Sequence, residues 1–346
     1  MLVIVTPGFP ENENDSTCLP AIQQFVLALK QLYPANQLII VSFQYPFIKT
    51  EYHWHGVKVV SLGGKNRSGI LRVLTWFKAF IVLKKIHKRH PIRGILSLWL
   101  SECSFVSSLF SKRYHVLHYM WLQGQDAKKE NHYIKRIRPK ADQVIAISDF
   151  SRNEFYKNHG QMPFMIAENG IDPLIFPALN IGHRNLDILG VGSLIPVKNY
   201  ALFVEIIAEI KKQGTELKVV IAGAGEGETE LRKLINTLGL ETTITLSGAL
   251  PHSEILELMA KSNVFLHTSL YEGNSTVLIE ALYSGCRVIS TQALCQGPVK
   301  NLFVSNAKND LILKTRSAVS AANETPERVL FNSMAATAQK IIGLYL

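Results

Sequence analysis

Two glutamates, one in a short polar loop and one in the helical segment that follows it, are spaced so that they could bind a phosphate that carries sugar hydroxyls. An apolar run, residues 264–268, leads into this loop, and a helical pattern follows it. Glu272 lies in the loop and Glu280 lies in the helix, eight residues later. Residues 273–276 place backbone N–H groups at the start of the helix, where such groups bind phosphate and other anions. The two carboxylates can then accept hydrogen bonds from sugar hydroxyls on either side of a bound phosphate.

The same residues have a purely structural interpretation. Glu280 would be a surface residue of the helix, while Asn274 and Ser275 would only cap it. The sequence argues against this alternative, because Glu280 is followed by Ala-Leu and by a turn at Gly285 into the strand-like run 287–290. The helix is therefore short and lies directly between two predicted strands. Glu280 is expected to face the protein rather than the solvent.

These residues must be positioned by an alternating series of strands and helices. Strands separated by helix-length segments form parallel sheets with right-handed crossovers, so the order predicts an α/β fold. The series restarts after residues 173–184, where Pro, Gly and Asn interrupt the periodicity. Two doubly wound α/β domains are expected, with ligands at the carboxyl ends of the strands. The predicted strands are 2–5, 37–42, 57–61, 94–98, 116–119, 143–147, 164–167, 187–191, 217–222, 243–247, 264–268 and 287–290; the predicted helices are 20–32, 70–87, 200–213, 228–238, 252–262 and 276–284.

Composition excludes several classes of protein. The chain has 346 residues, of which 47% are hydrophobic and 18% charged, so it has ample apolar surface to fold and is not disordered. Its four cysteines form no C-x-x-C pair, which indicates neither a disulfide framework nor a zinc site. A reducing cytoplasm is the expected location.

The net charge of +10 comes from the first half of the chain alone. Residues 1–172 contain 22 Lys and Arg against 12 Asp and Glu, whereas residues 173–346 contain 15 of each. A one-sided basic surface suits an anionic partner such as a nucleic acid, a phospholipid surface or a phosphorylated substrate. A solvated basic surface with no partner is the alternative.

Several segments together resemble the retaining glycosyltransferases of family 4, also called group 1, which have the GT-B fold. The resemblance covers residues 143–290 closely and residues 1–140 only in outline. It implies two Rossmann-like parallel-sheet domains that face each other across a cleft. The matching segments are 147–151, 168–172, 191–199, 220–225, 247–250 and the E-x7-E pair Glu272 and Glu280. The implied domains are an acceptor domain, 1–172; a linker, 173–184; a donor domain, 185–325; and a C-terminal helix within 326–346 that returns to the first domain.

The resemblance also implies roles for the donor site. Lys198 would neutralise the donor diphosphate, and Glu280 would bind the ribose hydroxyls. Glu272 would hold the transferred sugar, with the amides of residues 273–276 on the diphosphate, and Leu250 would contact the base. The chain departs from the family at Ser193, where an Arg is usual. The donor-binding candidates are Gly192, Ser193, Lys198, Gly223, Gly225, Leu250, Glu272, Gly273, Asn274, Ser275, Thr276 and Glu280.

The acceptor side follows the family less closely. Residues 116–126 end a strand and enter a polar loop, where many members carry His-Gly-x-Asp; here Gln123 replaces the His. The resemblance implies that Asp126 positions or deprotonates the acceptor hydroxyl and that Gln123 bonds the donor sugar. His118 is a further catalytic candidate, although strand alternation directs it away from Gln123, as in a core histidine. Together with Glu272, the catalytic candidates are thus Asp126, Gln123 and His118. The other acceptor-side candidates are Gly8, Phe9 and Gly124.

A basic helical stretch, Leu71–Arg93, carries aromatic residues among its Lys and Arg. Such a helix can lie on an anionic membrane. The alternative is a packed helix whose C-terminal cations complement the macrodipole. The most apolar run, residues 70–86, contains four basic residues and is too short and too charged to cross a bilayer. Membrane docking would make a lipid-linked saccharide the acceptor and place the protein on the inner face of the plasma membrane.

The resemblance thus implies a retaining hexosyltransferase that uses a UDP- or GDP-linked sugar in cell-surface polysaccharide or lipopolysaccharide assembly. No cofactor and no metal are expected, because the chain has no D-x-D. No nucleic-acid partner is expected either, because no recognition motif is present. Two alternatives stay open: a nucleotide-sugar epimerase of the same architecture, and a catalytically degenerate binding or scaffolding protein.

Overall fold

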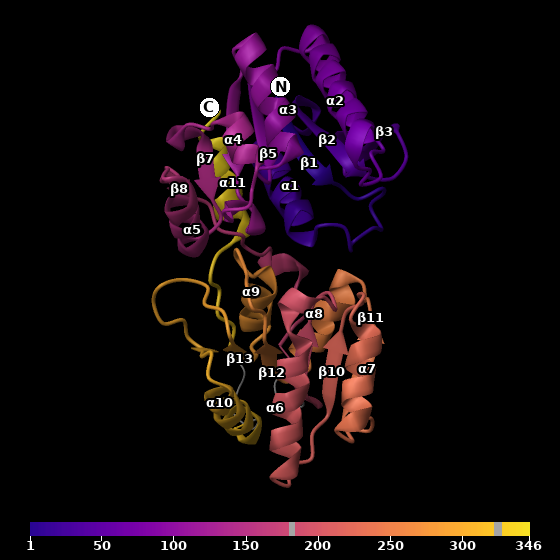
Figure 1. Cartoon of the computed structure of the whole chain (residues 1–346), viewed down its shortest axis with the longest axis vertical. Coiled ribbons are helices and arrows are strands. Elements are labelled where there is room, and N and C mark those ends of the chain that lie inside the picture. Colours follow the sequence, from indigo (N-terminus) through magenta and orange to yellow (C-terminus); the bar gives the residue numbers. More distant parts are fainter. Residues whose placement is uncertain (180–183, 322–326) are drawn as a thin grey trace. The chain divides into compact units, whose positions relative to one another are not determined.

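The computed structural model describes residues 1–179, 184–321 and 327–346. It divides the chain into two compact units, one comprising Met1–Gly170 with Met334–Leu346 and the other Ile171–Ser333 (Figure 1). Residues 173–179 and 184 of the expected linker belong to the second unit, whereas residues 180–183 lie outside the described residues. The chain returns to the first unit at Met334, later than residue 326, which is not described.

The first unit is built on an eight-stranded sheet with the order β3-β4-β2-β1-β5-β6-β7-β8. All neighbouring strands are parallel except β3 and β4. The strands are β1 Leu2–Gly8, β2 Leu38–Tyr45, β3 Thr50–Trp54, β4 Val57–Ser61, β5 Gly94–Leu98, β6 Leu117–Trp121, β7 Val144–Ala146 and β8 Met165–Ile166. The helices are α1 Pro20–Leu32, α2 Gly69–Arg89, α3 Glu102–Tyr114, α4 Tyr133–Ile137, α5 Asp149–His159 and α11 Met334–Ile342.

Helices cover both faces of this sheet. The central strand β1 is apolar and buried on both sides, as expected for a parallel strand inside an α/β layer. Leu2 and Ile4 pack in the core that contains residues of α1 and α11, whereas Val3 and Val5 pack in the core that contains residues of α2 and α3. The alternation of side chains along β1 therefore divides the unit into two cores. None of the described helices has both the length and the apolar composition that crossing a bilayer requires.

The antiparallel hairpin of β3 and β4 was not predicted. Its two-residue turn is His55-Gly56, and both residues have positive φ, 45° and 81°. This conformation is typical of type I′ turns, which join antiparallel strands tightly. Only Trp54 of β3 is buried, so the strand lacks the apolar run that predicted the others.

The second unit contains a six-stranded parallel sheet with the order β11-β10-β9-β12-β13-β14. The strands are β9 Leu186–Val191, β10 Val219–Ala222, β11 Ile244–Gly248, β12 Ser262–His267, β13 Arg287–Ser290 and β14 Leu302–Val304. The helices are α6 Tyr200–Lys212, α7 Glu228–Thr237, α8 His252–Ala260, α9 Thr276–Tyr283 and α10 Lys308–Ser320.

The order of these strands creates a switch point between β9 and β12. From β9 the chain proceeds to β10 and β11 on one side, then returns to the other side of β9 as β12. The loops that follow β9 and β12 therefore leave neighbouring strands at the same edge of the sheet. In open α/β sheets this edge is where ligands bind.

Candidate active site

Backbone hydrogen bonds join the two loops at the switch point. Leu270 N–H donates to the Val197 carbonyl at 2.8 Å, and Thr268 Oγ1 donates to the Lys198 carbonyl at 3.2 Å. These contacts fix the loop after β9 against the loop after β12. Two residues far apart in sequence, Lys198 and Glu272, are thereby held together.

Lys198 and Glu272 form an ion pair with a distance of 2.6 Å between Nζ and Oε1. Their side chains are only 22% and 17% exposed, so the pair is screened less than a surface pair. The ion pair unites the predicted phosphate-binding cation with the predicted sugar-binding carboxylate.

A histidine that was not predicted as a site residue completes this cluster. His267 ends β12, and its Nε2 lies 3.2 Å from Glu272 Oε1 and 3.0 Å from Ser269 Oγ. Its Nδ1 lies 3.0 Å from Ser290 Oγ on the neighbouring strand β13. The only sequence signal was a polar residue at the end of an otherwise apolar strand.

The electrostatics of this cluster favour a charged carboxylate and a neutral imidazole. Burial raises the pKa of Glu272, but the hydrogen bond with His267 and the positive charge of Lys198 lower it to about 2. Burial lowers the pKa of His267 below its ordinary value, and the nearby Glu272 only partly offsets this. At neutral pH, Glu272 is therefore an anion that accepts hydrogen bonds.

Glu280 has a second histidine as its partner. The carboxylate is buried in α9, and its Oε1 lies 2.8 Å from Nε2 of His252, the first residue of α8. Burial lowers the pKa of His252, but the hydrogen bond and the charge of Glu280 outweigh this and raise it. Glu280 is thus a buried residue rather than a surface residue of the helix. His252 was not predicted as a site residue, because its partner is 28 positions away.

The glycines of the two preceding loops allow close contact between backbones. A Cβ on Gly223 would lie 1.9 Å from the Gly192 carbonyl oxygen, and one on Gly225 would lie 2.4 Å from the Leu194 carbonyl oxygen. Gly192 and Gly223 also have φ of 152° and 154°, which side chains disfavour. These three predicted donor-binding glycines build the loops against each other, a role that needs no ligand.

The loop before α9 contains an amide side chain with buried, unpartnered polar atoms. Both Oδ1 and Nδ2 of Asn274 are buried without a hydrogen-bond partner. Ser275 is the N-cap of α9, yet its side chain makes no capping hydrogen bond. Capping therefore does not explain these residues, and the unpartnered amide fits a polar ligand.

The remaining donor-side candidates occupy simpler positions. Ser193 is exposed in the loop after β9. Leu250 is partly buried and packs against the core beside α8 and α9. Thr276 is the first residue of α9 and follows Gly273 and Ser275 in the same loop.

On the first unit, the structure revises two predicted residues. His118 is buried in β6, where its Nε2 lies 2.8 Å from Ser97 Oγ, and burial lowers its pKa to about 3. Phe9 is completely buried and packs edge-on against Trp54, with ring centroids 4.9 Å apart. Both side chains are therefore core residues, because neither presents a group to a ligand. Gly8 is buried at the end of β1.

Asp126 organises the loop that follows β6. Its carboxylate accepts backbone N–H bonds from Leu100 at 2.8 Å, from Gly124 at 2.8 Å and from Gln123 at 3.0 Å. Burial raises the pKa of Asp126, and these backbone hydrogen bonds oppose that shift. The carboxylate therefore joins the loops after β5 and β6, whereas Nε2 of Gln123 is buried without a partner.

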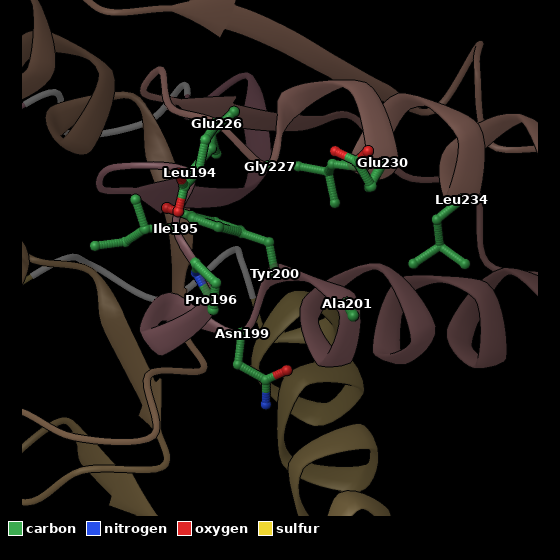
Figure 2. A pocket seen from close by; sticks show the side chains of 11 residues that line it. Leu194, Ile195, Pro196, Asn199, Tyr200, Ala201, Glu226, Gly227, Glu230 and Leu234 are labelled. Atoms are coloured by element: carbon green, nitrogen blue, oxygen red, sulfur yellow. The ribbon is translucent and has the colours of Figure 1, made fainter.

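A pocket of about 610 Å³ lies next to this site but is distinct from it. Its walls come from the loop that leads into α6 and from the start of α7, including Ile195, Tyr200 and Glu230 (Figure 2). Lys198, Glu272 and Glu280 do not line it. Because it contains none of the paired charges, we assign the chemistry to the switch-point loops.

The family model of the group 1 glycosyl transferases matches residues 172–339. Over these residues, just under half of the chain, the sequence is similar to that family. The match contains both glutamates, Lys198 and the glycine turns, so the predicted resemblance to group 1 is confirmed.

Curated relatives are similar over about half of the chain. A Campylobacter jejuni enzyme, N-acetylgalactosamine-N,N'-diacetylbacillosaminyl-diphospho-undecaprenol 4-alpha-N-acetylgalactosaminyltransferase, is 35% identical over 168 residues, which is 46% of this chain and 43% of that protein. One subunit of the human phosphatidylinositol N-acetylglucosaminyltransferase is 27% identical over 197 residues, covering 56% of this chain and 39% of that protein. The matches span less than half the length of these relatives.

Solved structures are similar over the whole chain. Anabaena HepE in complex with UDP and glucose superposes with a TM-score of 0.69 at 18% identity, covering all of this chain and 95% of that one. The lipopolysaccharide outer core galactosyltransferase WaaB in its apo form has a TM-score of 0.68 at 16% identity and full coverage of both chains. The predicted α/β class with two Rossmann-like units of the GT-B type is confirmed.

Proposed function

We propose that this protein transfers a hexose-type sugar from a nucleotide sugar to a saccharide or a lipid-linked saccharide, with retention of anomeric configuration. The observation that carries the proposal is the ion pair of Lys198 with Glu272 at the switch point of the second sheet, together with Glu280, which is buried in the helix that follows the same loop. One cation, two carboxylates and a helix N-terminus match a donor that combines a diphosphate with two sugars.

In this reaction the bond between the anomeric carbon and the diphosphate oxygen breaks while the acceptor hydroxyl oxygen bonds to the same carbon. Attack on the face from which the diphosphate leaves retains the configuration. The acceptor proton passes to the leaving phosphate oxygen, and the products are a glycoside and a nucleoside diphosphate. Lys198 and the N-terminus of α9 stabilise the negative charge that develops, so the proposed mechanism needs no metal.

Donor binding requires the Lys198–Glu272 pair to rearrange. The pair is closed in this structure, with 2.6 Å between the charged atoms. A diphosphate attracts Lys198 Nζ and leaves Glu272 to accept hydrogen bonds from the transferred sugar. His267 keeps the carboxylate in place during this exchange, because its hydrogen bond does not involve Lys198.

The acceptor is proposed to bind to the first unit. Nε2 of Gln123, which is buried without a partner, is proposed to donate a hydrogen bond to a hydroxyl of the donor sugar. Asp126 acts by shaping the loop around Gln123 and Gly124 rather than as a base. The Campylobacter and human relatives are named for undecaprenol-linked and phosphatidylinositol substrates. We therefore propose a lipid-linked acceptor in cell-surface glycan assembly, used at the inner face of the plasma membrane.

Thermal shift and calorimetry with UDP, GDP and their common sugars, without added metal, test the donor site. UDP comes first, because it is bound in the HepE structure. We expect one nucleotide to stabilise the wild type selectively, Lys198→Ala to lose this effect and Lys233→Ala, an exposed control on α7, to keep it. Stabilisation that is equal in Lys198→Ala and wild type would contradict the site.

Product analysis then distinguishes the reaction. NMR of the glycoside is expected to show a retained anomeric centre, and an inverted centre would overturn the proposed stereochemistry. Conversion of one nucleotide sugar into another without an acceptor would identify an epimerase. No binding of any nucleotide at millimolar concentration would favour the scaffolding alternative.

A further inference from the structure

Helix α2 packs against the first unit through one narrow face. Thr75, Ala79, Leu83 and Ile86 are buried at spacings of four, four and three residues, which places them on one side of the helix. The opposite side of α2 is exposed over most of its length, with Ile81 half-buried in the middle, and the helix lies at the periphery of its unit (Figure 1).

The first half of this exposed side is apolar. Ile70, Val73, Leu74 and Phe77 are 80%, 53%, 48% and 64% exposed. Their spacing of three, one and three residues aligns them in one stripe over two turns. An aligned group of large apolar side chains in water is costly for a protein with no partner.

The second half of the same side is basic. Lys84, Lys85, Lys88 and Arg89 are all exposed and continue the direction of the apolar stripe. Residues 52–101 contain ten Lys and Arg and no Asp or Glu. The charges of Lys85 and Arg89 do act on one acidic residue, Glu51, but Glu51 already forms an ion pair with Lys58 at 2.7 Å. The exposed side of α2 is therefore divided along its length into an apolar end and a cationic end.

We propose that α2 docks the first unit onto an anionic lipid bilayer. The apolar stripe of Ile70, Val73, Leu74 and Phe77 inserts at the boundary between headgroups and acyl chains, and the cationic end lies against the lipid phosphates. This arrangement matches the two properties of a bilayer interface, apolar depth and negative surface charge. The docking site gives the proposed reaction access to a lipid-linked acceptor; in that respect alone it rests on the proposed function.

A nucleic acid fits this surface less well. Phosphate backbones would bind the cationic end, but they offer no partner to four exposed apolar side chains. A protein partner would need an acidic patch beside an apolar groove, whereas a bilayer supplies both features continuously along the 21 residues of α2.

Vesicle co-sedimentation with the full chain tests the proposal without any sugar transfer. The probes are vesicles of phosphatidylcholine alone and of phosphatidylcholine with about 30% phosphatidylglycerol, at physiological salt. The first variant is Val73→Gln/Leu74→Gln/Phe77→Gln and the second is Lys84→Gln/Lys85→Gln/Lys88→Gln, because Gln removes the property but supports a helix. The control is Leu313→Gln/Lys233→Gln, which changes exposed residues of the second unit.

We expect the wild type and the control to bind the anionic vesicles and not the neutral ones. Each basic residue near an anionic surface contributes about fivefold in affinity, so the Lys variant is expected to lose at least about tenfold. The apolar variant is expected to lose at least about tenfold as well. Far-UV circular dichroism shows that each variant is folded.

Three results would overturn the proposal: no binding of the wild type to anionic vesicles, equal binding of the wild type and the apolar variant, or equal binding of the wild type and the Lys variant. Nucleotide binding on the same preparations separates the two proposals. Loss of vesicle binding with intact donor binding would reject docking alone, and vesicle binding without donor binding would reject the proposed activity alone.

Discussion

Glu272 keeps its charge in a largely buried position because two neighbours stabilise the anion. His267 and Lys198 approach the same oxygen, Oε1, at 3.2 and 2.6 Å. Their effect exceeds the cost of burial, and the pKa falls to about 2 from an ordinary value of 4.5. A carboxylate of this kind is an acceptor of hydrogen bonds at neutral pH and not a general acid, so its proposed role is to hold sugar hydroxyls.

This lowered pKa predicts a specific dependence of stability on pH. A carboxyl group whose pKa is lowered in the folded state stabilises that state above its unfolded pKa and loses the effect as the pH falls towards the folded pKa. The stabilisation from Glu272 is therefore expected to be constant above pH 4.5 and to decline below it, by about 1 kcal/mol at pH 3.5. Urea unfolding of the wild type and Glu272→Gln measures this, and a difference between them that does not change from pH 6 to 3.5 would contradict it.

His252 is predicted to titrate above its ordinary pKa of 6.5, because Glu280 stabilises its charged form more than burial opposes it. The pair then stabilises the fold fully below pH 6.5, and this contribution is lost as the pH rises through the pKa of the folded state. Glu280→Gln removes the charge that stabilises the protonated imidazole, so the pKa of His252 is expected to fall.

Imidazole NMR spectra follow this titration directly. His118 is an internal reference, because burial lowers its pKa to about 3 and it is expected to stay neutral throughout the range from pH 5 to 9. A wild-type His252 that titrates below 6.5, or one that Glu280→Gln leaves unchanged, would show that the hydrogen bond does not control its charge.

At the scale of the elements, the sequence predicted the second unit in detail. Helices α6, α7, α8 and α9 begin at the predicted residues Tyr200, Glu228, His252 and Thr276. Each start follows a turn that interrupts an apolar periodic pattern, which is a strong local signal. The predicted positions of these helices place Lys198 and Glu272 in loops at the edge of the sheet where the structure has them, and Glu280 in the helix that follows.

Elements and contacts without a local signal were missed. Strand β14 has three residues, and α10 begins in a polar stretch whose apolar positions Leu311 and Ile312 form a weak pattern.

The histidine partners of the two glutamates were missed for another reason. Sheet order brings His267 beside Ser290 and His252 beside Glu280, and strand order is a property of tertiary packing. Burial likewise decides that Phe9 and His118 are core residues.

The glycine turns make a prediction about how the elements of the second unit fit together. In Gly223→Ala the new Cβ would lie 1.9 Å from the Gly192 carbonyl oxygen, so the loops after β9 and β10 must separate. We expect a loss of at least about 3 kcal/mol in the free energy of unfolding, or failure to fold. Gly297→Ala is the control, because nothing lies within 4 Å of its Cβ position and a change near zero is expected. Urea denaturation compares the two, and equal stabilities would contradict the proposed loop contact.

On the scale of the whole molecule, the two units differ in charge, and the first unit is built from both ends of the chain. The excess positive charge belongs to residues 1–172, whereas the second half is balanced. The last helix, α11, follows the second unit in sequence but belongs to the first unit. Its residues Met334, Ala338, Ile341 and Ile342 are buried in the core of the first unit together with residues of α1. Tyr345 continues this packing, and its hydroxyl donates to the Ile95 carbonyl at 2.8 Å. The stability of the first unit therefore depends on the end of the chain.

A truncation after Ser333 is expected to separate the stabilities of the two units. Removal of α11 and Tyr345 takes four buried side chains from the first core, a loss above about 5 kcal/mol that a single unit rarely tolerates. Limited proteolysis with mass spectrometry is expected to show early cleavage within residues 1–170 and protection of the second unit. Removal of Leu346 alone, which is 91% exposed, is the control and is expected to leave the proteolysis pattern unchanged.

Because Lys198, Glu272 and Glu280 all belong to the second unit, stabilisation of that unit by a nucleotide is expected to survive the truncation. Its loss together with intact proteolytic protection of the second unit would mean that the first unit supplies an essential part of the donor site.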